Sequence, residues 1–346
     1  LSVTSDYNGA EISCYGEADG EATITPTYGI APFTYQWDDP LNQTDSIATG
    51  LTAGWYRVTV IDNNSVTYID SIEVTQADTI SYTSISTAAC EGKNDGTIDI
   101  TPAGGTILAD YTYTWSTATG SGIVPGTQDQ VALSGGRYYL TVTDANLCTK
   151  TDSIDVSENA ASTAPTGISV TNNNTCLGIT KTLTPTGGIL GYNASWNWYS
   201  EAACTNLLHT GNAFDVDPAA TTSYWVRAEG DCDTTVTALD SAVVLTPSVV
   251  ADSMSKTLDN TAPGTNVTLS IHGGTLGDGA TWTWYLDAAG TSPLPEVPFG
   301  TNNDSVTVAP LVTTQYWARA EGTCNNTAMV TTTVTINPLP LKPATP

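Results

Sequence analysis

The sequence predicts an all-β protein made of several small sandwiches. Threonine, a β-branched residue that suits a pleated and half-exposed surface, accounts for 61 of the 346 residues. No 11-residue window has the 3.6-residue apolar period of an amphipathic helix. Short alternating stretches are instead separated about every 8 to 12 residues by clusters of Gly, Pro, Asn and Asp, as in a β-sandwich.

The charge balance excludes several classes of partner. The chain has 9 basic and 35 acidic residues and a formal net charge of −26, which opposes binding to nucleic acid or to an anionic membrane surface. No apolar run approaches the roughly 18 residues that a membrane span needs, so no membrane insertion is expected. The start at Leu1 lacks the pattern of a signal peptide, so we expect a mature piece of a longer protein.

Two internal repeats organise the first half of the chain. The pattern Gly54-x-Tyr56-x-x-Thr59-Val60-x-Asp62 returns 82 residues later, ending at Asp144. An earlier set of residues returns after 76 positions: Cys14, Asp19 and Pro26 become Cys90, Asp95 and Pro102. The growing offset places the insertions in loops.

The second half repeats a different unit. Trp196-x-Trp198-Tyr199 returns 86 residues later at Trp282 to Tyr285, and the run from Tyr224 to Cys232 returns after 92 residues at Tyr316 to Cys324. We therefore expect four domains at 1–78, 79–160, 161–247 and 248–337, followed by a Pro-rich connector at 338–346. Nearly absent linkers predict an elongated rod.

Each unit has a tryptophan on an early-middle strand and a tyrosine near the start of a late strand. This order resembles the immunoglobulin-like plan, so the predicted fold is four tandem immunoglobulin-like β-sandwiches. The residues concerned are Trp37, Trp115, Trp196 and Trp282, with Tyr56, Tyr138, Tyr224 and Tyr316.

The motifs of the first two units, Cys-x-Gly-x-x-Asp-Gly, Tyr-x-Trp, Gly-x-Tyr and Thr-Val-x-Asp, resemble the SprB-type repeat. That repeat occurs in very large surface adhesins of Bacteroidota, including gliding-motility adhesins. The last two units, with Trp-x-Trp-Tyr and Tyr-Trp-x-Arg-Ala-Glu-Gly-x-Cys, resemble the Ig-like modules of the same large secreted proteins. The resemblance implies an extracellular location at the cell surface, but such modules act as spacers as often as binders.

Seven cysteines at domain-consistent positions indicate an oxidising compartment. Cys90 and Cys148 are the only two in the second unit, near its first and last strands, and are expected to form a disulfide. By analogy Cys176 pairs with Cys232, with Cys204–Cys232 as the alternative. Repeat alignment leaves Cys14 and Cys324 unpaired, because Val66 stands at the position of Cys148 and Ala262 at that of Cys176.

An acidic residue followed by a hydroxyl residue and then by an apolar residue or threonine occurs eight times. This tripeptide resembles the acceptor pattern of the general O-glycosylation system of Bacteroidota, although a chain rich in Thr and Asp also generates it freely. The candidate acceptors are Ser46, Ser71, Thr79, Ser153, Thr234, Ser241, Ser253 and Ser305.

Calcium is the one candidate cofactor. Carboxylate oxygens suit this ion and extracellular sites can be weak. The candidate ligands are Asp19, Asp62, Asp95 and Asp144. Asp-Gly turns form without metal, however, and no Asp-x-Asp-x-Asp run occurs.

The sequence argues against an enzyme, since no nucleophile elbow, zinc-binding motif or phosphate loop occurs. The expected function is an extracellular stalk or fibre segment of a large bacterial surface protein, spacing or polymerising at the cell surface. Its expected partners are copies of itself or neighbouring domains. The alternative is an adhesin module that binds a polysaccharide or a host surface, for which the pairs Trp196/Trp198 and Trp282/Trp284 could form an exposed strip.

Overall fold

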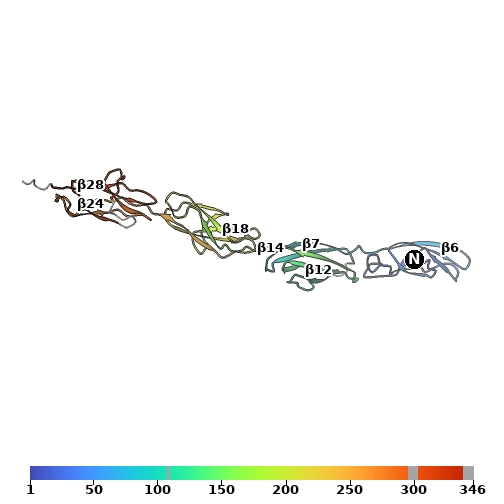
Figure 1. The fold of residues 1–346 in the computed structure, drawn as a ribbon. Helices are drawn as coiled ribbons and strands as arrows, with labels where there is room; N and C mark the ends of the chain where they lie inside the picture. The colour runs from blue at the N-terminus through green and yellow to red at the C-terminus, as the bar shows by residue number, and fades with distance from the viewer. Residues whose placement is uncertain (107–109, 295–302, 338–346) are drawn as a thin grey trace, which may run out of the picture. The chain divides into compact units, whose positions relative to one another are not determined.

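The structure is a computed structural model, and it describes residues 1–106, 110–294 and 303–337. These residues contain strands and no helix, as Figure 1 shows. The all-β prediction is therefore confirmed, whereas the expected connector at 338–346 lies outside the described residues. The chain divides into two compact units, Leu1–Ala161 and Ser162–Pro346.

The described residues form four separate hydrophobic cores, two in each unit. Each core draws its residues from one stretch of sequence, 1–74, 80–156, 168–242 or 251–336, and we call the four bodies sandwiches 1 to 4. The domain limits at residues 78, 161 and 248 stay a prediction.

Sandwich 1 has two three-stranded sheets, with the strand orders β1-β2-β4 and β3-β5-β6. Alternate residues of β5 point into the core, so Tyr56, Val58 and Val60 are buried between exposed or half-buried neighbours. Its strands are β1 (Ser2–Val3), β2 (Gly20–Thr23), β3 (Thr34–Trp37), β4 (Ile47–Leu51), β5 (Gly54–Ile61) and β6 (Thr67–Val74).

Sandwich 2 repeats this plan in the sheets β11-β9-β7 and β10-β12-β13, and adds the short parallel pair β14-β8. Its strands are β7 (Ser81–Thr87), β8 (Ala89–Cys90), β9 (Gly96–Ala103), β10 (Thr112–Thr117), β11 (Gln130–Leu133), β12 (Gly136–Thr143), β13 (Thr149–Val156) and β14 (Glu158–Asn159).

Sandwich 3 has the sheets β15-β17-β20 and β19-β18-β21-β22, and the parallel pair β16-β23. Its strands are β15 (Gly167–Val170), β16 (Thr175–Cys176), β17 (Lys181–Thr186), β18 (Ser195–Tyr199), β19 (Leu207–Thr210), β20 (Phe214–Val216), β21 (Thr222–Glu229), β22 (Ala238–Ala242) and β23 (Val244–Leu245).

Sandwich 4 has the sheets β24-β25-β27 and β26-β28-β29. Its strands are β24 (Ser253–Lys256), β25 (Val267–His272), β26 (Thr281–Tyr285), β27 (Ser305–Val308), β28 (Thr314–Glu321) and β29 (Val330–Val334).

The core tryptophan of each sandwich is fixed by its indole N–H, which donates to a backbone carbonyl. Trp37 donates to Asp45 O and Trp115 to Thr127 O, both at 2.9 Å. In sandwiches 3 and 4 the equivalent donors are Trp198 and Trp284, the second member of each pair. Trp196 and Trp282 are buried in the same cores, as expected, and the hydrogen bond of the indole N–H distinguishes the second member of each pair.

The late-strand tyrosines of the first two sandwiches form a tyrosine corner, in which the hydroxyl bonds back to the backbone a few residues upstream. The Tyr56 hydroxyl donates to Thr52 O at 2.9 Å, and the Tyr138 hydroxyl lies 2.8 Å from Ser134 O. The first two sandwiches therefore share with the immunoglobulin-like plan both the core tryptophan and the tyrosine that holds the loop before a late strand.

In sandwiches 2 and 4 a Gly-Gly pair follows a strand, β9 or β25, and lies close to the segment that leads into the same sandwich. A Cβ atom added at Gly104 would lie 2.1 Å from the Thr79 carbonyl oxygen, and one added at Gly274 would lie 2.8 Å from Val249 O. Both glycines also have positive φ, near 78° and 70°. Only glycine fits where the backbone must approach this closely in this conformation.

Candidate functional site

Each unit has a disulfide at the joint between its two sandwiches. In the first unit Cys14 of sandwich 1 is bonded to Cys148 of sandwich 2, with a Cα–Cα distance of 5.7 Å. In the second unit Cys176 of sandwich 3 is bonded to Cys324 of sandwich 4, with a Cα–Cα distance of 5.4 Å. Each disulfide therefore joins two sandwiches instead of closing one.

Both expected pairings inside a sandwich, Cys90–Cys148 and Cys176–Cys232, are wrong. Cys148 precedes β13, whereas Cys90 pairs with β14, which follows the far end of β13. An eight-residue strand spans about 26 Å, and a disulfide tolerates a Cα–Cα distance of at most about 7 Å. Strand β22 separates Cys232 from Cys176 in the same sense.

The remaining cysteines also differ from expectation. Cys14 and Cys324, expected to be unpaired, are bonded, and Cys90 and Cys232 are disulfide-bonded as well. Cys204 is the free cysteine of the described chain; it is buried, and burial raises the pKa of its thiol. The alternative pairing Cys204–Cys232 is thus also wrong.

A tight loop between β12 and β13 carries Cys148 to the joint. Asp144 organises this loop, because its Oδ1 accepts the backbone N–H groups of Asn146 and Cys148, both at 2.9 Å. Its Oδ2 accepts the N–H of Thr106 at 2.8 Å. The carboxylate therefore holds the loop in place before any contact with the neighbouring sandwich.

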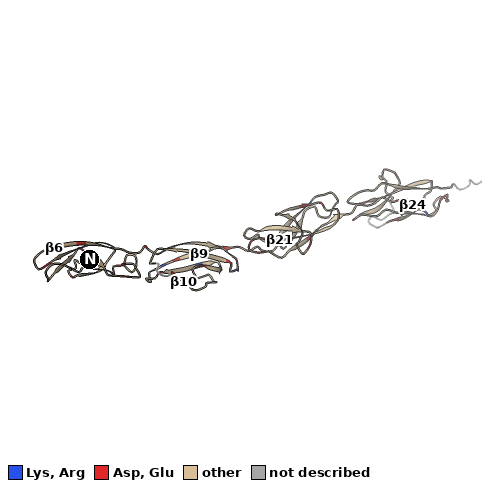
Figure 2. Cartoon of the chain, turned by 180° about the vertical axis from the view of Figure 1, so that it is seen from behind, with Lys and Arg blue, Asp and Glu red and all other residues tan. Residues whose placement is uncertain are grey.

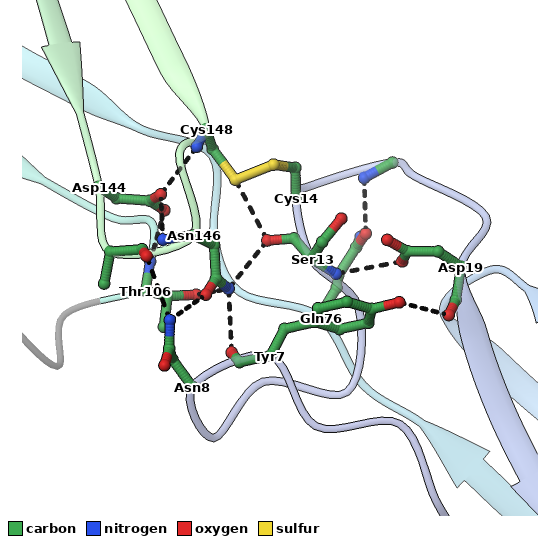
Figure 3. Close-up of a disulfide and its surroundings, with 12 residues drawn as sticks. Tyr7, Asn8, Ser13, Cys14, Asp19, Gln76, Thr106, Asp144, Asn146 and Cys148 are labelled. Carbon is green, nitrogen blue, oxygen red and sulfur yellow. Dashed lines mark hydrogen bonds between the residues drawn. A yellow bond between two sulfur atoms is a disulfide. The ribbon is translucent and has the colours of Figure 1, made fainter.

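Asn146 joins the two sandwiches of the first unit, as Figure 3 shows. Its Nδ2 donates to the carbonyl oxygens of Tyr7 and Ser13 and to Thr106 Oγ1, all at 3.0 Å. In return Asn8 of sandwich 1 donates to Asn146 Oδ1 at 2.8 Å and to Ala145 O at 3.1 Å. One amide side chain thus satisfies the backbone of a loop in the preceding sandwich.

The joint of the second unit uses different residues in the same manner. Asn325, next to Cys324, accepts the N–H of Ser248 at 2.8 Å and donates to its carbonyl at 2.9 Å. Asp278 accepts both the N–H and the hydroxyl of Thr246, and the backbone bond is the larger cause of the lowered pKa of this carboxyl. Ser248 and Thr246 belong to the segment between the two cores, so sandwich 4 holds its own entry segment.

The four aspartates expected as calcium ligands each bind a backbone loop. Asp19 accepts the N–H of Ser13 at 3.1 Å, and Asp95 accepts the N–H of Cys90 at 2.7 Å. Asp62 and Asp144 organise the loops that follow β5 and β12. The described residues contain no group of three or more His, Cys, Asp or Glu side chains placed to hold a metal ion. Calcium binding stays a prediction with these four residues as its candidates.

The eight candidate acceptors for O-glycosylation all reach the surface to some degree. Ser46 and Ser241 are half-buried, and the Ser241 hydroxyl lies 2.9 Å from that of Ser223. The other six are exposed: Ser71, Thr79, Ser153, Thr234, Ser253 and Ser305. Access agrees with the proposal, and glycosylation stays a prediction.

The tryptophan pairs cannot form a sugar-binding strip, because Trp196, Trp198, Trp282 and Trp284 are all buried. Polysaccharide binding therefore stays a prediction without these residues. Acidic residues recur along both units, and basic ones are few, as Figure 2 shows.

The four arginines are engaged in structural contacts. Arg57 and Arg137 pair with the exposed carboxylates of Asp38 and Asp155. Arg227 and Arg319 pair with Glu229 and Glu321, and each lies over a tyrosine ring, Tyr199 or Tyr285.

Sequence reasoning missed the joint residues Asn8, Asn146, Ser248 and Asn325. One available signal was the cysteine pattern itself. Sandwich 1 lacks a late cysteine, with Val66 at that position, and sandwich 4 lacks an early cysteine, with Ala262 at that position. Bonds from an early cysteine to a late cysteine of the following sandwich account for both gaps.

Family models match most of the chain. The model described as "SprB repeat" matches residues 8–42 and 83–120. The model described as "Ig-like domain CHU_C associated" matches residues 163–247 and 248–338, about half of the chain. Both matches confirm the resemblance stated from the motifs, and both families typify extracellular or cell-surface proteins. In the described residues no helix is long and apolar enough to cross a membrane.

Many solved structures match the chain, and those named here do so at low sequence identity. A titin I67–I69 variant is 11% identical, with a TM-score of 0.45, over 77% of this chain and all of that chain. The three N-terminal domains of the bacteriophage RB49 outer capsid protein Hoc are 16% identical, with a TM-score of 0.36, over 76% of this chain and all of that chain. The search of curated proteins gave no match.

Proposed function

The chain belongs to the CHU_C-associated Ig-like domain family, and from this membership and the joints we propose that it is a load-bearing spacer in the stalk of a bacterial cell-surface protein. Its matched families are non-enzymatic structural or adhesion domains. The proposed location is outside the cell, where disulfides persist.

The observation that carries the proposal is the connectivity of the joint disulfides. Tension applied along the chain enters at Cys14, crosses directly to Cys148, continues to Cys176 and crosses to Cys324. The residues between each bonded pair, which contain the greater part of all four cores, lie outside this covalent path. A sandwich could then lose its fold under load without letting the molecule lengthen.

The two disulfides prevent a large increase in the length of the chain under tension. The two disulfides span sequence separations of 134 and 148 residues, which would extend to about 95 nm if released. The segments left on the path, 1–14, 148–176 and 324–346, extend to only about 22 nm. A spacer with these bonds keeps a nearly fixed reach, which suits a protein that must hold a distance at a surface.

Single-molecule force spectroscopy tests this function on the intact chain held at its two ends. We expect oxidised molecules to extend by no more than about 22 nm before rupture, and molecules with reductant to unfold in steps of about 25 nm per sandwich. The variant Cys14→Ser/Cys148→Ser should extend further than wild type without reductant, whereas Cys204→Ser, which touches no disulfide, should behave as wild type. Unfolding steps of about 25 nm in fully oxidised wild type would refute the proposal.

A further inference from the structure

The loop Asp62–Val66 of sandwich 1 copies the joint loop Asp144–Cys148 of sandwich 2. Asp62 Oδ1 accepts the N–H groups of Asn64 and Val66, both at 2.9 Å, and its Oδ2 accepts the N–H of Ile30 at 3.1 Å. These bonds match, position by position, those of Asp144 with Asn146, Cys148 and Thr106. Ser65 and Leu147, the fourth residues of the two loops, both have positive φ.

The two copies differ in what they contact. Asn146 binds the preceding sandwich, whereas the Asn64 side chain has no hydrogen-bond partner among the residues that the structure describes. Thr106 is 7% exposed in its joint, and its counterpart Ile30 is 54% exposed. Val66, at the position of Cys148, is 64% exposed. The loop thus has the form of a joint loop, and its contact surface is exposed in the described chain.

Apolar side chains surround this loop. Tyr28, Ile30, Val66 and Tyr68 are all exposed there, beside a cavity of about 590 Å³ that Tyr28, Val66 and Tyr68 line together with Phe33. We call the surface made by these residues and Asn64 the Asn64 surface. Its exposed apolar side chains and its free amide are features of a contact site for another protein surface.

Sandwich 4 carries the matching half of a joint. Its segment Asn260–Ala262 repeats Asn174–Cys176 of sandwich 3: Asn260 and Asn174 have φ of 54° and 55°. Thr261 pairs in parallel with Ile336, as β16 pairs with β23. Ala262 is exposed at the position where Cys176 binds the next sandwich, and nearby Leu311, whose side chain lies beside Gly264, is exposed as well.

We propose that the Asn64 surface binds the Ala262 loop of a second copy of this chain, so that copies associate head to tail. The inference names a partner for the proposed spacer and rests on that function. Because Val66 and Ala262 replace the two cysteines, this joint is reversible, whereas those inside each unit are covalent. A heterologous contact of this kind generates an open chain of copies instead of a closed dimer.

The net charge of −26 on each copy opposes the contact. Copies should therefore associate better in salt that screens this repulsion, and the test is performed in about 0.5 M NaCl.

Cysteine trapping with two full-length variants tests the proposal. Val66→Cys chains are mixed with Ala262→Cys chains in a glutathione buffer, and covalent heterodimers are followed on non-reducing gels. The control replaces Val66→Cys with Ile85→Cys, a position on β7 that is at least as exposed. We expect heterodimers to form about tenfold faster than in the control, since docking raises the local thiol concentration. Adding Asn64→Ala to the Val66→Cys chain should bring the rate near that of the control.

Heterodimer formation no faster than in the control overturns the proposal, and so does equal formation of Val66→Cys homodimers. All substituted positions are exposed, and circular dichroism verifies the fold of each variant. The force experiment on single molecules does not depend on this contact, so failure of the trap and failure of the spacer function are distinguishable.

Discussion

Replacing Asn146 by alanine removes three hydrogen bonds between sandwiches 1 and 2 and leaves the one from Asn8 to Ala145 O. Two of its hydrogen bonds reach carbonyl oxygens of sandwich 1, at Tyr7 and Ser13, and a third comes from Asn8. A hydrogen bond in a folded protein contributes about 1 kcal/mol net, and the carbonyls left behind lose their donor. We therefore expect Asn146→Ala to lower the free energy of unfolding by about 2–3 kcal/mol.

Urea unfolding of the oxidised chain, followed by tryptophan fluorescence, measures this change. With a slope of about 2–3 kcal/mol per molar urea, the midpoint of the first unit should fall by about 1 M. The matched control is Asn64→Ala, which alters the same position of an equivalent loop whose amide has no partner in the described chain. We expect that variant to stay within about 0.5 kcal/mol of wild type. Equal shifts for the two variants would refute the reasoning.

Three further predictions concern thiols, pH and the tyrosine corner. Thiol titration of the unfolded, unreduced chain should give one thiol, which Cys204→Ser removes; a count of five or seven would contradict the joint disulfides. Lys256 lowers the pKa of Asp259 from 3.8 to about 2, so the stabilisation by this pair, present above about pH 4, should be lost as the pH falls toward 2. Melting curves across this range should show a smaller loss for Asp259→Asn than for wild type. Tyr138→Phe should destabilise sandwich 2 by about 1–3 kcal/mol in urea unfolding, because its hydroxyl bonds the backbone at two places; an unchanged midpoint would contradict this role.

Features that depend on local sequence were predictable. Alternation along β5 and β12 fixes which side chains enter a core. The Asp-capped loops at Asp62 and Asp144 form from residues within a few positions of each other and one backbone N–H from a more distant loop. The repeat pattern was sufficient for the number of sandwiches. The motifs were sufficient for the family, because they sit in the core and at the turns that define the fold.

The disulfide pairing was decided by the tertiary structure. When each repeat is considered by itself, its own two cysteines are the natural pair. The sequence therefore favoured a bond inside sandwich 2, between Cys90 and Cys148. These two lie at opposite ends of β13, whereas Cys14 lies on the loop that meets Cys148 across the joint. Composition and periodicity carry no information on which ends of neighbouring bodies meet. The packing of whole sandwiches decides which loops meet. The cysteines on those loops then form disulfides that link neighbouring sandwiches.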